Sequence, residues 1–303
     1  TVTSSLGSVN AGSLGSFGGS SQIYPAGHGG AVTLSGKTGV TVLGVDSYGG
    51  AVMDGDYDTA HGGNGGEVTI TSSDGAVSVG NVQTFGGDSP SFGGGTGGAV
   101  TLSGKLGVTA LNIATYGGAN TVEEEYLANG GDGGDVTITA SSGAVSTGNI
   151  RTFGGNSVSM GGGNGGAVVV SANGDVSVGN VFTHGGSNLN DNYQDADGGD
   201  GGDVSITSTL GSISGSVGVG GGSISSYGGN SHSRDGGHGG SVRMSAQGSI
   251  LLNAIRTIGG DNASHGSGSG GFGGDVSLSS NSGGISLLAG GGGIRTWGGY
   301  GHN

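Results

Sequence analysis

Short stretches of alternating apolar and polar residues recur along the chain, and Gly-rich segments separate them. The clearest example is the segment 135–155, DVTITASSGAVSTGNIRTFGG. Its apolar residues Val136, Ile138, Val145 and Ile150 all fall on one face of an extended chain, because side chains alternate along a strand. The segment therefore predicts three short strands that share an apolar face. No Gly-free segment shows the apolar spacing of a helix, so essentially no helix is expected.

The unit that contains this segment repeats through the whole chain. Strand starts fall at intervals of 32–38 residues, at Ala31, Glu67, Ala99, Asp135, Ala167, Asp203, Ser241 and Asp275. An incomplete copy opens the chain, with Val2 at the position of Ile138, which gives about nine rungs starting near residues 1, 31, 67, 99, 135, 167, 203, 241 and 275. Such a unit cannot bury its apolar face alone, but stacked copies build a continuous core. The repeat predicts an all-β, single-domain β-solenoid over residues 1–303, about 43 Å long at about 4.8 Å per rung.

Residues at equivalent positions should stack in columns along this coil. An apolar core column contains Leu14, Val45, Val82, Ile113, Ile150, Val181, Ile224, Ile255 and Ile294. One position earlier, four successive rungs carry Asn81, Asn112, Asn149 and Asn180, whose amides are expected to form a hydrogen-bonded ladder.

A nearly complete aromatic column precedes the Gly-Gly corners. It contains Phe17, Tyr48, Phe85, Tyr116, Phe153, Tyr227 and Trp297, with His184 and Ile258 at the two remaining positions. Alternation directs this column outward unless the corner reverses it, so its face is left open. The Gly-Gly pair after each of these residues is expected to adopt backbone conformations that other residues resist.

Composition removes several classes of protein. Gly accounts for 82 of 303 residues, but the period and Pro content of collagen are missing, and 31% hydrophobic residues argue against disorder. The absence of Cys excludes disulfides, Cys-bound zinc and thiol nucleophiles. No apolar run is long enough to predict membrane insertion. The net charge of −14 disfavours nucleic acid as a partner and favours a cation or a basic surface.

Three long loops carry acidic residues around a Tyr and emerge from the same corner, two rungs apart. Their acids are Asp54, Asp56 and Asp58, then Glu123, Glu124 and Glu125, then Asp191, Asp195 and Asp197. Ca²⁺ prefers six to eight oxygen ligands, so these loops are candidate calcium sites. The alternative is that they are solvated loops that keep the protein soluble.

Ser and Thr cover the outer face of the first strand of each unit. The pairs are Thr33/Ser35, Thr69/Thr71, Thr101/Ser103, Thr137/Thr139, Ser205/Thr207 and Ser277/Ser279, and Val169 and Arg243 interrupt the array. Such an array resembles the ice-binding faces of antifreeze proteins, although Thr is also simply a good strand residue. Enzymatic β-helices instead carry clustered carboxylates on a strand face. Because Arg151, Arg256 and Arg295 share a column without acidic neighbours in their strands, no enzymatic activity is expected.

The repeated pattern Gly-Asp-Val-Thr-Ile-Thr, followed by Gly-Ala-Val-Ser-x-Gly-Asn-Ile/Val-x-Thr-x-Gly-Gly, resembles a known family. It is similar, over essentially the whole chain, to the repeats of filamentous-haemagglutinin-type secreted proteins, especially the giant exoproteins of cyanobacteria. The resemblance implies a right-handed parallel β-helix, an extracellular or cell-surface location, and a role as a fibre, adhesin or matrix component. The chain contains no Asn-Pro-Asn segment of the kind that marks the secretion domain of that family.

Both ends of the coil are expected to be open to further stacking. Residues 1–30 contain no charged side chain, and soluble solenoids usually protect their edges with charges or caps. The residues expected at the ends are Val2, Val9, Leu14, Val276, Leu278, Ile285 and Ile294. We therefore expect an extracellular structural protein that assembles with itself, head to tail, into a filament. The alternatives are a segment of a large secreted adhesin that binds cell surfaces or glycans, a module that binds carbohydrate on the aromatic column, and an ice-binding solenoid.

Overall fold

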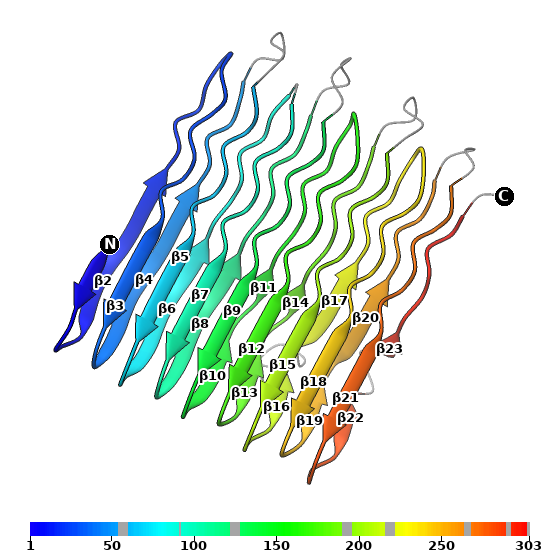
Figure 1. The fold of residues 1–303 in the computed structure, drawn as a ribbon. Helices are drawn as coiled ribbons and strands as arrows, with labels where there is room; N and C mark the ends of the chain where they lie inside the picture. The colour runs from blue at the N-terminus through cyan, green and yellow to red at the C-terminus, as the bar shows by residue number, and fades with distance from the viewer. Residues whose placement is uncertain are drawn as a thin grey trace.

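The chain coils as a β-solenoid in which each strand pairs in parallel with its copy in the next rung (Figure 1). The computed structural model describes residues 1–53, 60–90, 92–121, 128–189, 196–215, 222–263, 268–288 and 292–301. No helix occurs within these ranges. The predicted all-β solenoid is confirmed.

The first sheet contains one strand from each of nine successive passes of the chain. Its strands are β1 (Val2–Ser4), β3 (Val32–Gly36), β5 (Val68–Ser72), β7 (Val100–Gly104), β9 (Val136–Ala140), β12 (Val168–Ala172), β15 (Val204–Ser208), β18 (Val242–Ala246) and β21 (Val276–Ser280). Val2 pairs with Leu34, which aligns in turn with Ile70, Leu102 and Ile138. The opening segment therefore enters the sheet in the register that its sequence predicts.

The second sheet has 14 strands, because its path is continuous in early rungs and divided in later ones. The continuous strands are β2 (Val9–Phe17), β4 (Gly39–Tyr48), β6 (Ala76–Gln83) and β8 (Gly107–Ala114). The divided pairs are β10 (Ala144–Thr147) with β11 (Ile150–Arg151), β13 (Val176–Val178) with β14 (Val181–Phe182), β16 (Ile213–Gly215) with β17 (Ser223–Tyr227), β19 (Ile250–Leu252) with β20 (Ala254–Ile258), and β22 (Ile285–Leu287) with β23 (Gly293–Arg295). The expected three strands per rung therefore hold only for the later rungs.

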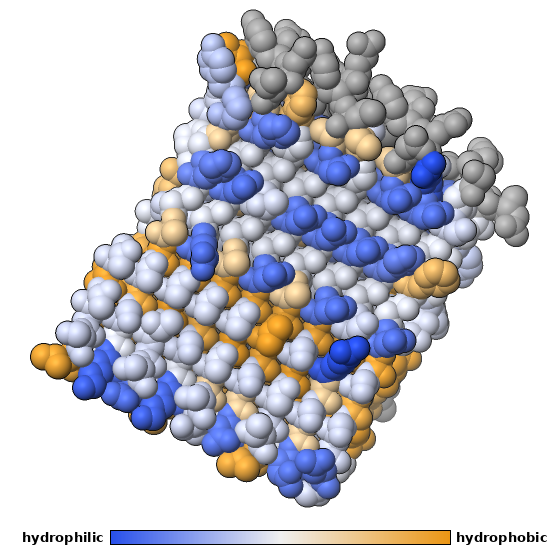
Figure 2. Space-filling model, viewed as in Figure 1, coloured by the Kyte–Doolittle hydropathy of each residue, from blue (hydrophilic) through white to orange (hydrophobic). Residues whose placement is uncertain are grey.

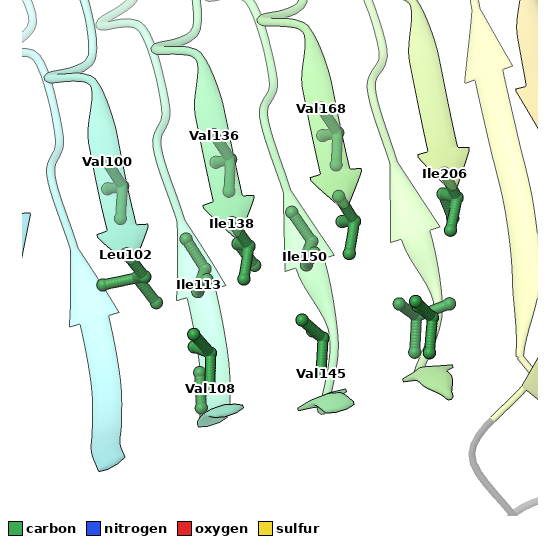
Figure 3. Close-up of a cluster of buried hydrophobic side chains, with 14 of the residues drawn as sticks. Val100, Leu102, Val108, Ile113, Val136, Ile138, Val145, Ile150, Val168 and Ile206 are labelled. Atoms are coloured by element: carbon green, nitrogen blue, oxygen red, sulfur yellow. The ribbon is translucent and has the colours of Figure 1, made fainter. Parts of the chain in front are cut away.

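The apolar face predicted from alternation is buried between the two sheets. Val136, Ile138, Val145 and Ile150 are each 1% exposed or less. Figure 3 shows Val136 and Ile138 of one sheet beside Val145 and Ile150 of the other, and the same arrangement recurs along the stack. Burying a Val or Ile side chain stabilises a fold by about 1.5–3 kcal/mol, so this repeated column supplies most of the driving force for coiling.

The number of rungs differs slightly from the nine predicted. The coil makes about seven turns. Of the nine strands in the first sheet, the seven between β1 and β21 have a hydrogen-bonded neighbour on both sides. The two terminal strands, β1 and β21, have a neighbour on one side only.

Beyond the sheets, each rung continues as two extended limbs that run out and back (Figure 1). Their backbone N–H groups follow a three-residue cycle. The N–H of Gly130 donates to the carbonyl of Gly161 in the next rung (3.0 Å), and the N–H of Gly131 donates across the rung to the carbonyl of Gly118 (2.8 Å). The residue that follows, Asp132, is exposed. The cycle then repeats at Gly133 and Gly134. Three residues per turn is the period of a polyproline II chain, so this half of the solenoid has an interior of hydrogen-bonded backbone.

The Gly-Gly pairs serve a different purpose from the one expected. Among the described glycines, a positive φ occurs at Gly39, Gly107, Gly292 and Gly293, and none of these follows an aromatic residue. A Cβ atom built on Gly118 would instead lie 2.0 Å from the carbonyl oxygen of Gly87. The expectation of unusual backbone conformations at these pairs was wrong. Glycine is needed there because neighbouring limbs approach too closely for any side chain.

Candidate functional surfaces

Outward-facing residues of the returning limbs form side-chain ladders between rungs. Asp132 Oδ1 accepts from Asn164 N (2.6 Å), Asp135 Oδ1 from Ala167 N (2.8 Å) and Asp203 Oδ1 from Ser241 N (2.7 Å). Each short carboxylate thus satisfies a backbone N–H of the next rung that would otherwise face solvent. Figure 2 shows hydrophilic side chains in rows across the pale, Gly-rich limbs.

Eight of the nine acidic residues predicted to hold Ca²⁺ lie outside the described residues. They are Asp54, Asp56, Asp58, Glu123, Glu124, Glu125, Asp191 and Asp195. The ninth, Asp197, lies on a returning limb, where its Oδ1 accepts from Asp235 N (3.1 Å). Within the described ranges, no group of three or more Asp, Glu or His side chains is placed to hold a metal ion. Calcium binding by these loops stays a prediction.

Asp197 lines a shallow pocket of about 440 Å³ on the limbs, together with Asp200, Asp235 and His238. Its carboxylates already accept backbone hydrogen bonds. Asp200 Oδ1 accepts from His238 N (2.6 Å), and Asp235 Oδ1 accepts from Ser269 N (2.6 Å). These contacts assign the acids of the pocket to the ladders that join successive rungs.

The four predicted Asn residues lie side by side on the outer surface of the second sheet. Asn112 Nδ2 donates to Asn81 Oδ1 (3.0 Å), and the backbone N–H of Asn149 donates to Asn112 Oδ1 (3.1 Å). Asn180 N then donates to Asn149 Oδ1 (2.9 Å), and Ser223 N to Asn180 Oδ1 (3.0 Å). We call this row the Asn ladder.

The aromatic column lies at the surface, and its rings stack on one another. Centroid distances between successive rings from Phe17 through His184 to Tyr227 are 4.5–5.3 Å. The planes of Phe85 and Tyr116 differ by only 5°. In the middle of the column, from Phe85 to His184, each ring therefore has a stacked ring on both faces and presents its edge to solvent. The column ends in Phe17 and Trp297, which are 63% and 58% exposed.

Two members of the column have shifted pKa values. Burial lowers the pKa of His184 to about 4, and its Nε2 is a buried atom for which the described residues supply no hydrogen-bond partner. Burial raises the pKa of Tyr48 to about 12, with help from the negative charge of Asp46. The single proton of the Tyr48 hydroxyl faces two acceptors, Asp46 Oδ1 (3.2 Å) and Gln83 Oε1.

A pit of about 340 Å³ lies between the Asn ladder and the aromatic column. Its floor is Ala114, which pairs with Gln83 on one side and with Arg151 on the other. The sequence places Arg151 in a column but does not show which columns lie beside it, and the pit forms where three columns meet. The available signal was a small residue, Ala114, between two long ones.

The hydroxyl array covers the outer face of the first sheet. One unbroken column contains Thr3, Ser35, Thr71, Ser103, Thr139, Ser171, Thr207, Ser245 and Ser279. The neighbouring column contains Thr33, Thr69, Thr101, Thr137, Val169, Ser205, Arg243 and Ser277. Its interruptions are those seen in the sequence, and ice binding by this face stays a prediction.

The predicted end residues differ in how far they are exposed. Val2, Ile285 and Ile294 are 48%, 46% and 45% exposed, whereas Leu14, Val276 and Leu278 are half-buried. Val9 is already buried, at 6% exposed. Ile255 precedes Ile294 in the same column and is 0% exposed. The exposure of Ile294 therefore comes from the missing neighbour on the outer side of the last rung.

No protein-family model, curated protein or solved structure matches this chain. Within the described residues, no helix has the length and apolar character needed to cross a membrane.

Proposed function

We propose that this protein is an extracellular structural element that assembles head to tail through its terminal rungs into a surface or matrix filament. The observation that carries the proposal is the contrast between Ile294 and Ile255. Both belong to one column, yet only the residue in the terminal rung is exposed. A further rung would bury Ile294 as Ile294 buries Ile255.

The column order specifies how the two ends would meet. In a head-to-tail stack, Val2 of one copy follows Leu278 of another, Val9 follows Ile285, and Leu14 follows Ile294. Phe17 would follow Trp297 at the aromatic position of the column. No charged side chain in residues 1–30 opposes this contact. The contact joins the first rung of one copy to the last rung of another. Because these are two different surfaces, each added copy leaves a free end, and the assembly can grow into an open filament.

The free energies of burial and of association indicate a reversible assembly. Completing the burial of residues that are already half-buried contributes about 1 kcal/mol each. Association costs about 4–15 kcal/mol in lost freedom, so a few side chains do not suffice. Backbone hydrogen bonds from the open edges of both sheets must add to them. Filament formation should therefore depend on protein concentration.

The extracellular location rests on the resemblance to filamentous-haemagglutinin-type repeats. The main alternative, a segment of a large secreted adhesin, uses the same fold, and its further rungs would come from the same chain. Glycan binding by stacking on the aromatic column lacks support, because the internal ring faces are covered by neighbouring rings.

Negative-stain electron microscopy over a rising concentration series tests the proposal. We expect thin fibres with an axial repeat of about 43 Å, and we expect Ile294→Lys to prevent them. Ile294 is 45% exposed in the single molecule, so the Lys side chain can reach solvent without unfolding it. Leu106→Lys is the matched control, because Leu106 is 62% exposed away from both ends. Rods that stay monomeric at every concentration would contradict the proposal and favour the adhesin segment.

A further inference from the structure

The pit at Ala114 is distinctive because of the side chains that surround it. The Asn ladder, through Asn81, Asn112 and Asn149, forms one wall, and the edges of Phe85 and Tyr116 form the other. Gln83 and Arg151 close its two ends along the solenoid axis. Among the described residues that line it, Arg151 is the only charged one.

The amide oxygens around the pit already accept hydrogen bonds from the protein. Gln83 Oε1 accepts from the Tyr48 hydroxyl, on the side of Gln83 away from Ala114. Asn81 Oδ1 accepts from Asn112 Nδ2, and Asn112 Oδ1 accepts from the backbone N–H and Nδ2 of Asn149. An amide has two N–H bonds, so these groups still present donors to a ligand.

The ring edges add to the same electrostatic character. Phe85 and Tyr116 stack face to face at 4.8 Å, so the atoms that they present to the pit are edge atoms. Aromatic edges carry the positive end of the ring quadrupole. The Arg151 guanidinium lies 5.9 Å from the centroid of the Phe182 ring, which supports it from the next rung. The pit is thus a donor-rich site with one positive charge on a protein of net charge −14, and the nearest acid of its column, Asp46, lies beyond Gln83.

We propose that this pit binds a small organic carboxylate of about the size of a hexuronic acid. A carboxylate accepts two parallel hydrogen bonds from a guanidinium, and Arg151 supplies that group. The remaining ligand oxygens would accept from the amides of Gln83 and Asn112. A neutral sugar lacks the charge that Arg151 pairs with. The volume of about 340 Å³ leaves room for one such ring.

The test is an NMR titration of the full chain at low ionic strength, with sodium glucuronate as the probe. Glucose serves as the neutral probe of the same ring size, and inorganic phosphate as a second anion. We expect glucuronate to shift the side-chain amide signals of Asn112 and Gln83, and we expect glucose to bind with an affinity about tenfold lower. Added salt should weaken the binding of glucuronate, because salt screens the attraction between an exposed pair of charges.

Two variants and a control locate the site. Arg151→Gln removes the charge, and Ala114→Gln fills the pit with the residue that the preceding rung carries at this position, Gln83. Each should weaken glucuronate binding about tenfold or more. Arg256→Gln alters an arginine of the same column outside the pit and should leave binding unchanged. Equal binding of glucose and glucuronate, tighter binding of phosphate, or unchanged binding by Arg151→Gln would overturn the proposal.

Discussion

His184 shows how a single residue adapts to a column built for another type. It occupies an aromatic position between Phe153 and Tyr227, at centroid distances of 5.1 and 4.5 Å. Stacking accepts a neutral imidazole, but burial disfavours the charged form and lowers the pKa of the ring to about 4. The unfolded chain, with a His pKa of about 6.5, binds this proton more readily.

The free energy of unfolding should therefore decrease as the pH decreases, because of His184. Its contribution is complete above about pH 6.5 and is lost as the pH drops toward 4, since the unfolded state then binds more protons. Between pH 7 and pH 4.5 this amounts to about 2 kcal/mol. Urea unfolding of the native chain and of His184→Phe at both pH values measures it. The variant should lose less stability on acidification, and an equal loss in both proteins would contradict this assignment.

At the scale of an element, a Thr hydroxyl joins the outgoing limb to the returning limb in several rungs. Thr183 Oγ1 donates to Gly202 O (2.6 Å), and Thr257 Oγ1 donates to Gly274 O (2.6 Å). Thr152 makes the equivalent bond to Gly166 O (2.5 Å) and is 0% exposed. Each of these Thr residues comes one position before a member of the aromatic column. The sequence pattern does not indicate their role, because Thr is also a common strand residue.

Replacing Thr152 by Val should destabilise the protein by about 1–3 kcal/mol, because the shape is kept while a buried carbonyl loses its side-chain donor. Thr152→Ser keeps the hydroxyl and is the matched control. Chemical denaturation of both variants measures the difference. The prediction fails if Val is tolerated as well as Ser.

At the scale of the whole molecule, the Gly-rich limbs connect folding with assembly. Gly118 and Gly19 are equivalent residues, the second glycine after the aromatic position. A Cβ on Gly118 would meet Gly87 O at 2.0 Å, whereas a Cβ on Gly19 would meet nothing within 4 Å. The first rung thus leaves open, on its outer side, the close contact that every later rung makes.

Gly118→Ala should cost about 3 kcal/mol or more, because the clashing backbone oxygen has no room to move. Gly19→Ala should unfold like the native chain. If filaments form head to tail, Gly19→Ala should nevertheless block them, since the next copy would place a carbonyl against the new methyl group. Thermal unfolding and sedimentation velocity measure the two effects separately. Normal filaments from Gly19→Ala would count against the proposed contact.

The alternation of Val136 and Ile138, and their recurrence in every rung, determined the solenoid, its register and its core from sequence alone. These features are readable because each depends on a short pattern that repeats at a fixed interval. The alignment of Val2 with the core column and the succession of Asn81, Asn112 and Asn149 follow from the same periodicity. No such signal exists for the Gly-rich limbs, because glycine has no side chain with which to mark a face.

The tertiary structure alone decided three further features. It showed that the limbs pack backbone to backbone, where Gly118 approaches Gly87 too closely for a side chain. It placed the aromatic column at the surface with its ring faces covered. It also created the pit at Ala114, whose walls come from positions that are separate in sequence. Each depends on distances between columns, and a one-dimensional repeat specifies which residues stack but not what lies beside them.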